Sequence, residues 1–224
     1  MAHVWKTYGQ TAVLRDVSFT AGARPVCLTA PSGAGKTTLL RILLGLEQPD
    51  RGEVLAPPGT RWSAVFQEDR LLEHLDARDN LRFVLGAVSP EALSLLEALG
   101  LGDVGGKAVA EYSGGMRRRL ALARALLHDS PVYLFDEATS NIDVESENDI
   151  MALIHALAKK KTVILISHRL VNAAGADRIY VMEKGRVVES GKHDALLAQK
   201  GLYARLWNAQ QELEQYTKKV GDAV

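Results

Sequence analysis

The chain has 224 residues, of which 47% are hydrophobic and 24% are charged. This length suits one well-cored domain and is too short for two ordinary domains with linkers. The composition excludes intrinsic disorder. Basic and acidic residues each number 27, so no net charge would recruit nucleic acid or an anionic membrane surface.

No apolar run approaches the roughly 18 residues that a membrane-spanning helix needs. The first residues, Met-Ala-His-Val-Trp-Lys, lack the basic and apolar regions of a secretory signal. The single Cys27 cannot form an internal disulfide, so we expect a reducing, cytosolic setting.

Short segments rich in β-branched and apolar residues predict strands, most of them separated by segments of helix length. The predicted strands lie at 12–19, 26–30, 63–66, 132–135, 163–167, 178–182 and 186–189. This pattern favours a mostly parallel sheet covered by helices on both faces. The turn at 183–186 predicts a hairpin, and the polar alternation of the first segment predicts antiparallel strands near the N-terminus.

The middle of the chain differs from both ends. From about 71 to about 128 it carries Leu- and Ala-rich helical stretches and no convincing strand. We interpret this region as a helical subdomain inserted into an α/β core of about 1–70 and 129–190. C-terminal helices are expected over about 192–219. The residues at helical spacing there, which predict a face packed on the core, are Tyr203, Leu206, Trp207, Gln210 and Leu213.

A glycine-rich turn lies between the predicted strand at 26–30 and a helical run. Residues 30–37 read Ala-Pro-Ser-Gly-Ala-Gly-Lys-Thr, and strand, glycine-rich turn and helix are the context of a P-loop. Converging backbone N–H groups bind a polyphosphate there, and the glycines let the chain approach its oxygens. The predicted nucleotide contacts are Ser32, Gly33, Ala34, Gly35, Lys36, Thr37 and Thr38.

Three side chains of this turn have predicted roles. Lys36 would neutralise the β- and γ-phosphates, Thr37 would ligate Mg²⁺ and Thr38 would reach the α-phosphate. Ala30 stands where the usual pattern begins with glycine. That departure costs stability only if the residue needs a positive φ.

The predicted strand at 132–135 ends in two adjacent carboxylates. We expect Asp136 to hold Mg²⁺ and Glu137 to act as the general base on the attacking water. A second helix N-terminus is predicted at Ser113-Gly114-Gly115, with Ser113 as its N-cap. The arginines at 117–119 that follow could suggest nucleic acid, but a solvated helix face is the favoured interpretation.

These motifs together resemble the nucleotide-binding domain of ATP-binding cassette (ABC) transporters over nearly the whole chain. The resemblance implies a P-loop NTPase (RecA-like) core with an antiparallel part near the N-terminus and an inserted helical subdomain. In chain order the motifs are Walker A at 30–37, the Q-loop at Gln67, the signature at 113–115, Walker B at Asp136-Glu137, the D-loop at 140–143 and the switch histidine at His168.

The resemblance also implies roles for further residues. Tyr8 stacks on adenine, with Trp5 as a weaker candidate. Gln67 contacts Mg²⁺ and the attacking water, and His168 contacts the γ-phosphate. The signature and the D-loop Asp143 serve a nucleotide sandwiched between two copies in a head-to-tail dimer.

As a partner, the resemblance implies permease subunits, so that ATP hydrolysis drives transport at the inner face of the cell membrane. Tyr112 and Met116 depart from the Leu and Gln that usually flank Ser-Gly-Gly, and Met116 cannot offer the hydrogen bonds of an amide. Together with Ala30, these departures leave open a nucleotide-binding module with little turnover. A soluble ABC ATPase outside transport is a separate alternative.

The two parts of the chain resemble different branches of this family. Residues 1 to about 130 look like separate importer ATPase subunits, whereas 136–224 look like exporter-type domains. We expect either a divergent natural subunit or a chimera joined around 128–137. Because the lobe that contacts the permease is importer-like, a separately encoded subunit is favoured.

Overall fold

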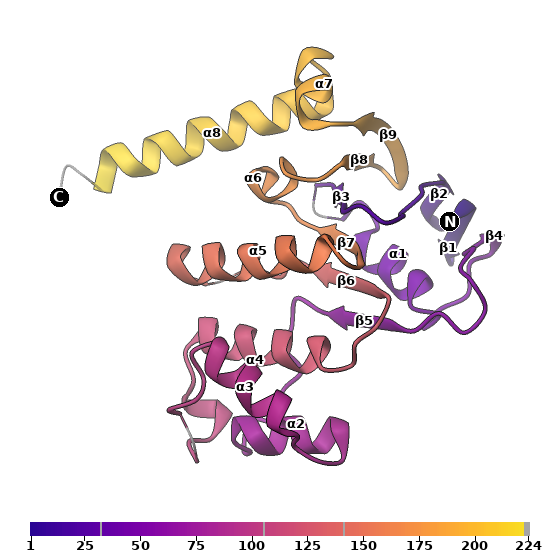
Figure 1. The fold of residues 1–224 in the computed structure, drawn as a ribbon. Helices are drawn as coiled ribbons and strands as arrows, with labels where there is room; N and C mark the ends of the chain where they lie inside the picture. The colour runs from indigo at the N-terminus through magenta and orange to yellow at the C-terminus, as the bar shows by residue number, and fades with distance from the viewer. Residues whose placement is uncertain (32, 105, 141, 222–224) are drawn as a thin grey trace. The chain divides into compact units, whose positions relative to one another are not determined.

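The computed structural model describes residues 1–31, 33–104, 106–140 and 142–221, which divide into two compact units (Figure 1). The first unit consists of Met1–Gly59 and Ile164–Val224, and the second consists of Thr60–Val163. Each unit contains both strands and helices.

An antiparallel sheet with the order β2-β1-β4 opens the first unit. Its strands are β1 (Ala2–Tyr8), β2 (Thr11–Val17) and β4 (Arg51–Glu53). Gly9, with a φ of 57°, turns the chain so that Tyr8 pairs with Thr11. Antiparallel strands were predicted here, but β1 and β4 were missed. In β1 only Val4 is fully buried, so an apolar pattern is weak there.

The central strand of the first unit is β3 (Val26–Thr29), which is buried along its whole length. It pairs in parallel with β7 (Thr162–Ile166) on one side and with β8 (Arg178–Glu183) on the other. A strand flanked by parallel partners and buried along its length is expected to be largely apolar, as Val26, Cys27 and Leu28 are, and Thr29 at its end is the polar exception.

The predicted hairpin joins β8 to β9 (Arg186–Gly191), which run antiparallel. Lys184 and Gly185 both have positive φ, 48° and 78°, as a tight two-residue hairpin loop requires. A Cβ on Gly185 would lie 2.2 Å from the carbonyl oxygen of Val13, so only glycine fits beside β2. The hairpin prediction is confirmed.

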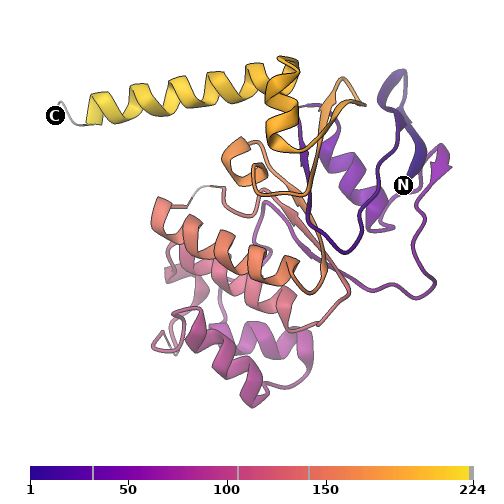
Figure 2. The same ribbon diagram turned by 45° about the horizontal axis from the view of Figure 1, so that its top comes forward.

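The helices of the first unit include α1 (Lys36–Leu43), α6 (Leu170–Ala173), α7 (His193–Ala198) and α8 (Leu202–Gly221). Figure 2 shows α8 as a long helix that follows α7. The Glu189 carboxylate accepts from the backbone N–H groups of Leu202 and Tyr203, which satisfies donors that a helix start leaves unpaired. Tyr203 is fully buried, and its hydroxyl lies 2.8 Å from Nδ1 of His193.

The second unit contains the parallel strands β5 (Trp62–Val65) and β6 (Val132–Asp136). Its helices include α2 (Ala77–Leu85), α3 (Pro90–Ala98), the 3₁₀ turn η1 (Val109–Glu111), α4 (Gly114–Leu126) and α5 (Val144–Ala158). An N-cap side chain accepts a backbone N–H three residues on at each α-helix, which fixes where the helix begins. The caps are Asp76, Ser89, Ser113 and Asp143.

Helices α2, α3 and α4 lie side by side around an apolar core (Figure 1). Leu81 of α2 and Leu120 of α4 are fully buried, and each such side chain contributes about 2 kcal/mol by leaving water. Met116 and Leu127 are partly buried against the same core. Helix α4 therefore turns an apolar face toward this core.

The α/β fold class with a mostly parallel main sheet and an N-terminal antiparallel part is confirmed. The described residues of 71–128 contain no strand, as expected. The second compact unit is larger than the expected helical insertion because β5, β6 and α5 belong to it. Along the described part of the chain, no helix combines the length and apolar character needed to cross a membrane.

Candidate functional site

The predicted phosphate loop joins β3 to α1 inside the first unit. Gly33 and Gly35 have φ values of 77° and 94°, which side chains disfavour. A Cβ on Gly35 would lie 2.8 Å from Cδ2 of Leu14 and 3.0 Å from the Val13 carbonyl oxygen. The glycine is thus required both for backbone angle and for space. Ser32 lies outside the described residues.

Lys36 begins α1, and its ammonium turns back onto the loop. Nζ donates to the carbonyl oxygens of Ala30, at 3.0 Å, and Pro31, at 3.4 Å. Ala30 is buried and is not among the residues with positive φ, so its methyl group adds no backbone strain. The departure from glycine at this position is structurally harmless.

The first turn of α1 presents Thr37, which is exposed, and Thr38, which is half-buried. Within Lys36–Leu43, all of which the structure describes, the first turn carries no acidic side chain. The start of a helix has a partial positive charge and unpaired N–H groups. The loop and α1 therefore form a place that favours an anion.

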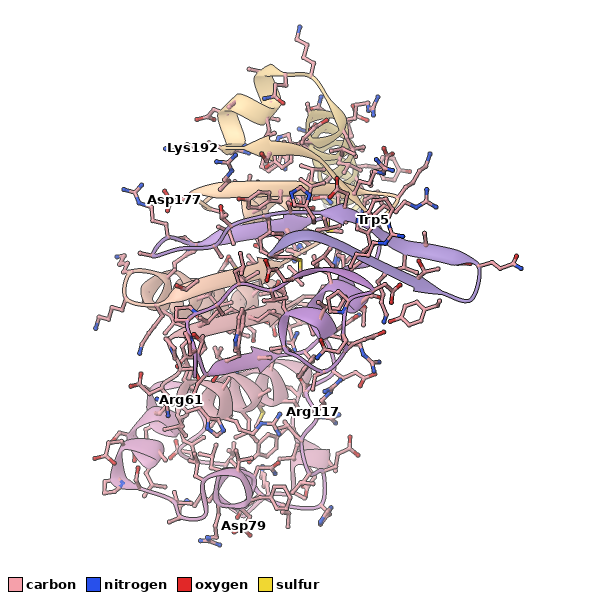
Figure 3. All side chains as sticks on the ribbon, turned by 90° about the vertical axis from the view of Figure 1, so that its right-hand side faces the viewer. Trp5, Arg61, Asp79, Arg117, Asp177 and Lys192 are labelled. Atoms are coloured by element: carbon pink, nitrogen blue, oxygen red, sulfur yellow. The ribbon has the colours of Figure 1, made fainter. Side chains whose placement is uncertain are left out.

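Tyr8 ends β1 with its side chain 45% exposed. Its hydroxyl donates to Oε1 of Glu47 at 2.5 Å, and partial burial together with this carboxylate raises the pKa of Tyr8. Glu47 is also paired with Lys6 and Arg41, at 3.3 and 3.4 Å. The hydroxyl is fixed while the ring keeps an exposed surface, as stacking requires. Trp5 (Figure 3) is half-buried on the same strand.

His168 follows β7 and is exposed. Its segment is held by Gln210 of α8: Nε2 donates to the His168 carbonyl oxygen at 2.5 Å, and Oε1 accepts from the Leu170 N–H at 2.9 Å. The helical spacing had predicted Gln210 only as part of a face packed on the core. One amide side chain thus ties the C-terminal helix to the backbone of the predicted switch histidine.

In the second unit, the acidic pair stands at the end of β6. Asp136 is buried, and Glu137 is half-buried with a φ of 48°, a backbone conformation that non-glycine residues rarely adopt. The Glu137 carbonyl oxygen accepts from Nη2 of Arg118 at 2.6 Å. A strong hydrogen bond therefore helps to hold the backbone of the predicted general base in this conformation.

The arginines at 117–119 do not form a solvated face. Arg118 is only 2% exposed, and burial lowers its pKa against the opposing effect of the nearby Asp69 carboxylate. Arg117 (Figure 3) is half-buried and donates to the carbonyl oxygens of Ala110 and Tyr112. The prediction was wrong above all for Arg118, whose guanidinium reaches backbone oxygens 18 to 52 residues away, which a helical pattern does not reveal.

The signature turn packs tightly on the start of α5. Ser113 accepts from the Met116 N–H at 3.2 Å, so the predicted N-cap is confirmed. A Cβ on Gly115 would lie 2.5 Å from Oγ of Ser146. Asp143 caps α5 by accepting from the Ser146 N–H at 2.8 Å, and this bond lowers the pKa of Asp143. Asn141 of the D-loop lies outside the described residues.

The predicted site residues thus fall into two sets. In the first unit the described ones are Tyr8, Gly33, Ala34, Gly35, Lys36, Thr37, Thr38 and His168. In the second unit they are Gln67, Ser113, Gly114, Gly115, Asp136, Glu137 and Asp143. Each set offers one helix N-terminus, that of α1 or that of α4, with N–H groups suited to an anion.

Residues 14–140 match the family model described as ABC transporter. The chain belongs to the ABC transporter family, and it is an ATP-binding domain of that family. The prediction drawn from the ordered motifs is therefore confirmed.

Curated relatives match along most of the chain. An ATP-dependent lipid A-core flippase of Paraburkholderia xenovorans is 37% identical over 88% of the chain. A mycobactin import ATP-binding/permease protein of Mycolicibacterium thermoresistibile is 38% identical over 94%. A solved bacterial Atm1-family ABC exporter with ATP bound is 30% identical over 93%, with a TM-score of 0.83. The chain spans 37%, 40% and 41% of these proteins, respectively.

These matches do not support the expected chimera. The family model runs across the supposed junction at 128–137, and a single exporter structure covers 93% of the chain. The expectation of an importer-like first half is likewise unsupported. The similarity is continuous and points to exporter-type relatives.

Proposed function

We propose that this chain hydrolyses ATP, with Mg²⁺, to drive a membrane transporter. The phosphate loop is the observation that carries the proposal. Two glycines with positive φ precede α1, whose first residue, Lys36, turns back onto the loop and whose first turn carries no acid. This arrangement suits a polyphosphate, and family membership supports the link to transport.

The first unit supplies the nucleotide contacts in this proposal. Backbone N–H groups of the loop bind the phosphate oxygens, Lys36 neutralises the β- and γ-phosphates, and Thr38 reaches the α-phosphate. The exposed ring of Tyr8 stacks on adenine, and His168 contacts the γ-phosphate. Each of these groups stabilises the negative charge or the position of the bound nucleotide.

The predicted metal ligands suit Mg²⁺. Thr37, Gln67 and Asp136 offer a hydroxyl, an amide carbonyl and a carboxylate, which are oxygen donors of the kind that Mg²⁺ takes beside phosphates. When bound, the ion neutralises charge on the transferred phosphoryl group.

Glu137 is the proposed general base for the attacking water, and Gln67 orients that water. A general base has to be held in place while it takes the proton. The hydrogen bond from Arg118 to the Glu137 carbonyl oxygen supports this role because it fixes the backbone from which the carboxylate extends.

A second copy of the domain completes the proposed site. Ser113, Gly114 and Gly115 would serve the ATP held by the partner's phosphate loop, with Asp143 beside them. The capped N-terminus of α4 supports this role because its N–H groups suit a phosphate oxygen. Two ATP molecules would then hold a head-to-tail dimer together.

Permease segments are the proposed membrane partner, which places the domain at the inner face of the cell membrane. The length of the matched relatives supports this proposal, since the chain spans only 37% to 41% of them. These relatives include one protein named for import and one named as an exporter.

A nucleotide-binding module with little turnover is the second candidate. Met116 stands in the signature turn and packs against the apolar core of α2, α3 and α4. A thioether so placed gives a bound phosphate no amide hydrogen bond, which favours a weaker contact with the second copy.

Steady-state turnover of Mg-ATP, measured together with equilibrium ATP binding, tests the proposal. Glu137→Gln should bind ATP normally and lose about 100-fold or more in turnover, because only the base is removed. Lys36→Ala should lose ATP affinity. Glu214→Gln, on the exposed part of α8, is the matched control and should change neither quantity.

Unchanged ATP binding in Lys36→Ala would refute the phosphate-loop assignment. Binding without measurable turnover in the wild type would refute hydrolysis and favour the low-turnover module.

A further inference from the structure

Arg118 contacts two segments that are far apart in sequence and that each carry a proposed site residue. Nη1 donates to the carbonyl oxygen of Phe66 at 2.5 Å and lies 3.4 Å from that of Gln67. On the other segment, Nη2 donates to Glu137 at 2.6 Å, and Nε donates to Ala138 at 2.5 Å. A single guanidinium therefore joins the Gln67 backbone to the Glu137 backbone.

The contact with the first segment includes a charge pair. Nη1 of Arg118 lies 3.1 Å from Oδ1 of Asp69, two residues after Gln67. A buried cation needs a counter-ion. Salt screens a partly buried ion pair less than it screens an exposed one. The charge pair therefore binds the Gln67 segment to α4 more firmly than carbonyl contacts alone.

The contact with the second segment acts on a backbone that is already unusual. Glu137 has a φ of 48°, and its carbonyl oxygen accepts the short bond from Nη2. Without that donor, the left-handed conformation at this position loses one of the contacts that maintain it. A shift of the guanidinium would thus reorient the peptide that carries the Glu137 side chain.

Only arginine can make this connection. Its guanidinium is a rigid plane with five N–H donors that point in different directions, whereas lysine ends in one small ammonium group. The three nitrogens of Arg118 divide between the two segments, with Nη1 on 66–69 and Nη2 and Nε on 136–138.

We propose that Arg118 is a positioning residue that couples the Gln67 segment to the general base Glu137. Movement of residues 66–69 is passed through the guanidinium to the backbone at 136–138 and so sets the position of the Glu137 carboxylate. This inference rests on the proposed function for its consequence in turnover, although the coupling itself is a property of the second unit.

Arg124 provides a matched control on the same helix. Its guanidinium donates to the carbonyl oxygens of Asp69 and Arg70, at 2.8 and 2.6 Å. Among the described residues, the hydrogen bonds of its guanidinium go to this segment and not to 136–138. Arg124→Lys therefore loosens the first segment alone, whereas Arg118→Lys disconnects the two segments.

Hydrogen exchange of backbone amides, measured by mass spectrometry on peptides covering 66–70 and 136–140, tests the coupling directly. Arg118→Lys should raise exchange in both peptides by about tenfold, and Arg124→Lys should raise it in 66–70 only. Asp69→Asn is a milder variant that keeps the guanidinium, and it should raise exchange in both peptides by a smaller factor. It decides the question if Arg118→Lys does not fold.

Turnover supplies the second readout. Asp69→Asn should lower kcat by about threefold in the wild-type background and leave kcat unchanged in the Arg118→Lys background, because its effect passes through Arg118. ATP affinity should stay within about twofold in both backgrounds, since the phosphate loop belongs to the other unit. A role limited to stability would give additive losses instead.

Two results would overturn the coupling: exchange that rises in 66–70 but not in 136–140 when Arg118 or Asp69 is changed, or additive losses of kcat. A wild-type protein without ATP turnover would instead count against the proposed function. The exchange measurement would then still decide the coupling, because it needs no activity.

Discussion

Two segments of this molecule perform similar tasks with different supports. Residues 136–138 follow β6 and carry Glu137, and residues 167–170 follow β7 and carry His168. The first segment is held by the buried, charged Arg118 of α4. The second is held by the neutral, half-buried amide of Gln210 of α8.

The difference indicates how firmly each proposed catalytic group is fixed. Removing a buried guanidinium from its partners lowers the unfolding free energy by several kcal/mol. One neutral hydrogen bond contributes only about 1 kcal/mol. The contacts that hold the Glu137 segment therefore contribute to the folding stability of the second unit. The His168 segment can be adjusted from the C-terminal helix with little effect on folding.

Removal of the Arg118 guanidinium should have the largest effect. Arg118→Met leaves Asp69 and several buried carbonyl oxygens without their donor, so we expect a loss of about 3–5 kcal/mol in unfolding free energy. Urea denaturation followed by circular dichroism measures it. Gln210→Ala should lose about 1 kcal/mol in the same assay. Equal losses would contradict the distinction between the two supports.

Loss of the Gln210 amide should lower activity more than stability. We expect Gln210→Ala to reduce kcat by about fivefold, because the backbone of His168 is released, with ATP affinity unchanged. In a His168→Ala background the same substitution should have no further effect on kcat. Gln215→Ala, exposed on the same helix, is the control. Additive losses would show that Gln210 acts elsewhere.

The start of α5 should make the second unit sensitive to acid. The pKa of Asp143 is lowered by the Ser146 N–H, so the stability from its charge is present above the unfolded pKa and is lost as pH falls through the folded pKa. Asp143→Asn keeps a good N-cap without the charge. The urea midpoints of wild type and variant should therefore converge between pH 7 and pH 4. A constant difference would exclude this role.

The smallest effect concerns Cys27 on β3. Burial raises the pKa of its thiol to about 12, so at pH 8 it is protonated and should react with a disulfide reagent only when the first unit opens. Gln210→Ala should leave this rate within about twofold of wild type, because the amide holds 168–170 and not the pairing of β3. A much faster reaction would mean that α8 stabilises the whole unit.

The sequence predicted what is local and missed what is long-range. The glycine-rich turn between a strand and a helix, the N-cap at Ser113 and the 183–186 hairpin were recognisable because their determinants lie within a few neighbouring residues. Arg118 and Gln210 were not, since their partners lie between 18 and 52 residues away and are largely backbone oxygens and amides. No side-chain pattern marks such partners.

Strand β1 was missed for a related reason. Its polar and aromatic residues become a strand through pairing with β2 and β4 rather than through their own apolar pattern. The suspected junction near Walker B was an error of another kind. Variants of the motifs on either side of 128–137 were interpreted as signs that the two parts of the chain come from different branches. The family model and the exporter structure instead match the chain across that point.

Light scattering of Glu137→Gln with and without saturating Mg-ATP tests the central claim most directly. Loss of the base should trap ATP between two copies, so the account predicts that the measured mass doubles on adding Mg-ATP and returns to the starting value once the nucleotide is removed. A protein that binds ATP and keeps the mass of one chain would contradict the proposed two-copy ATPase.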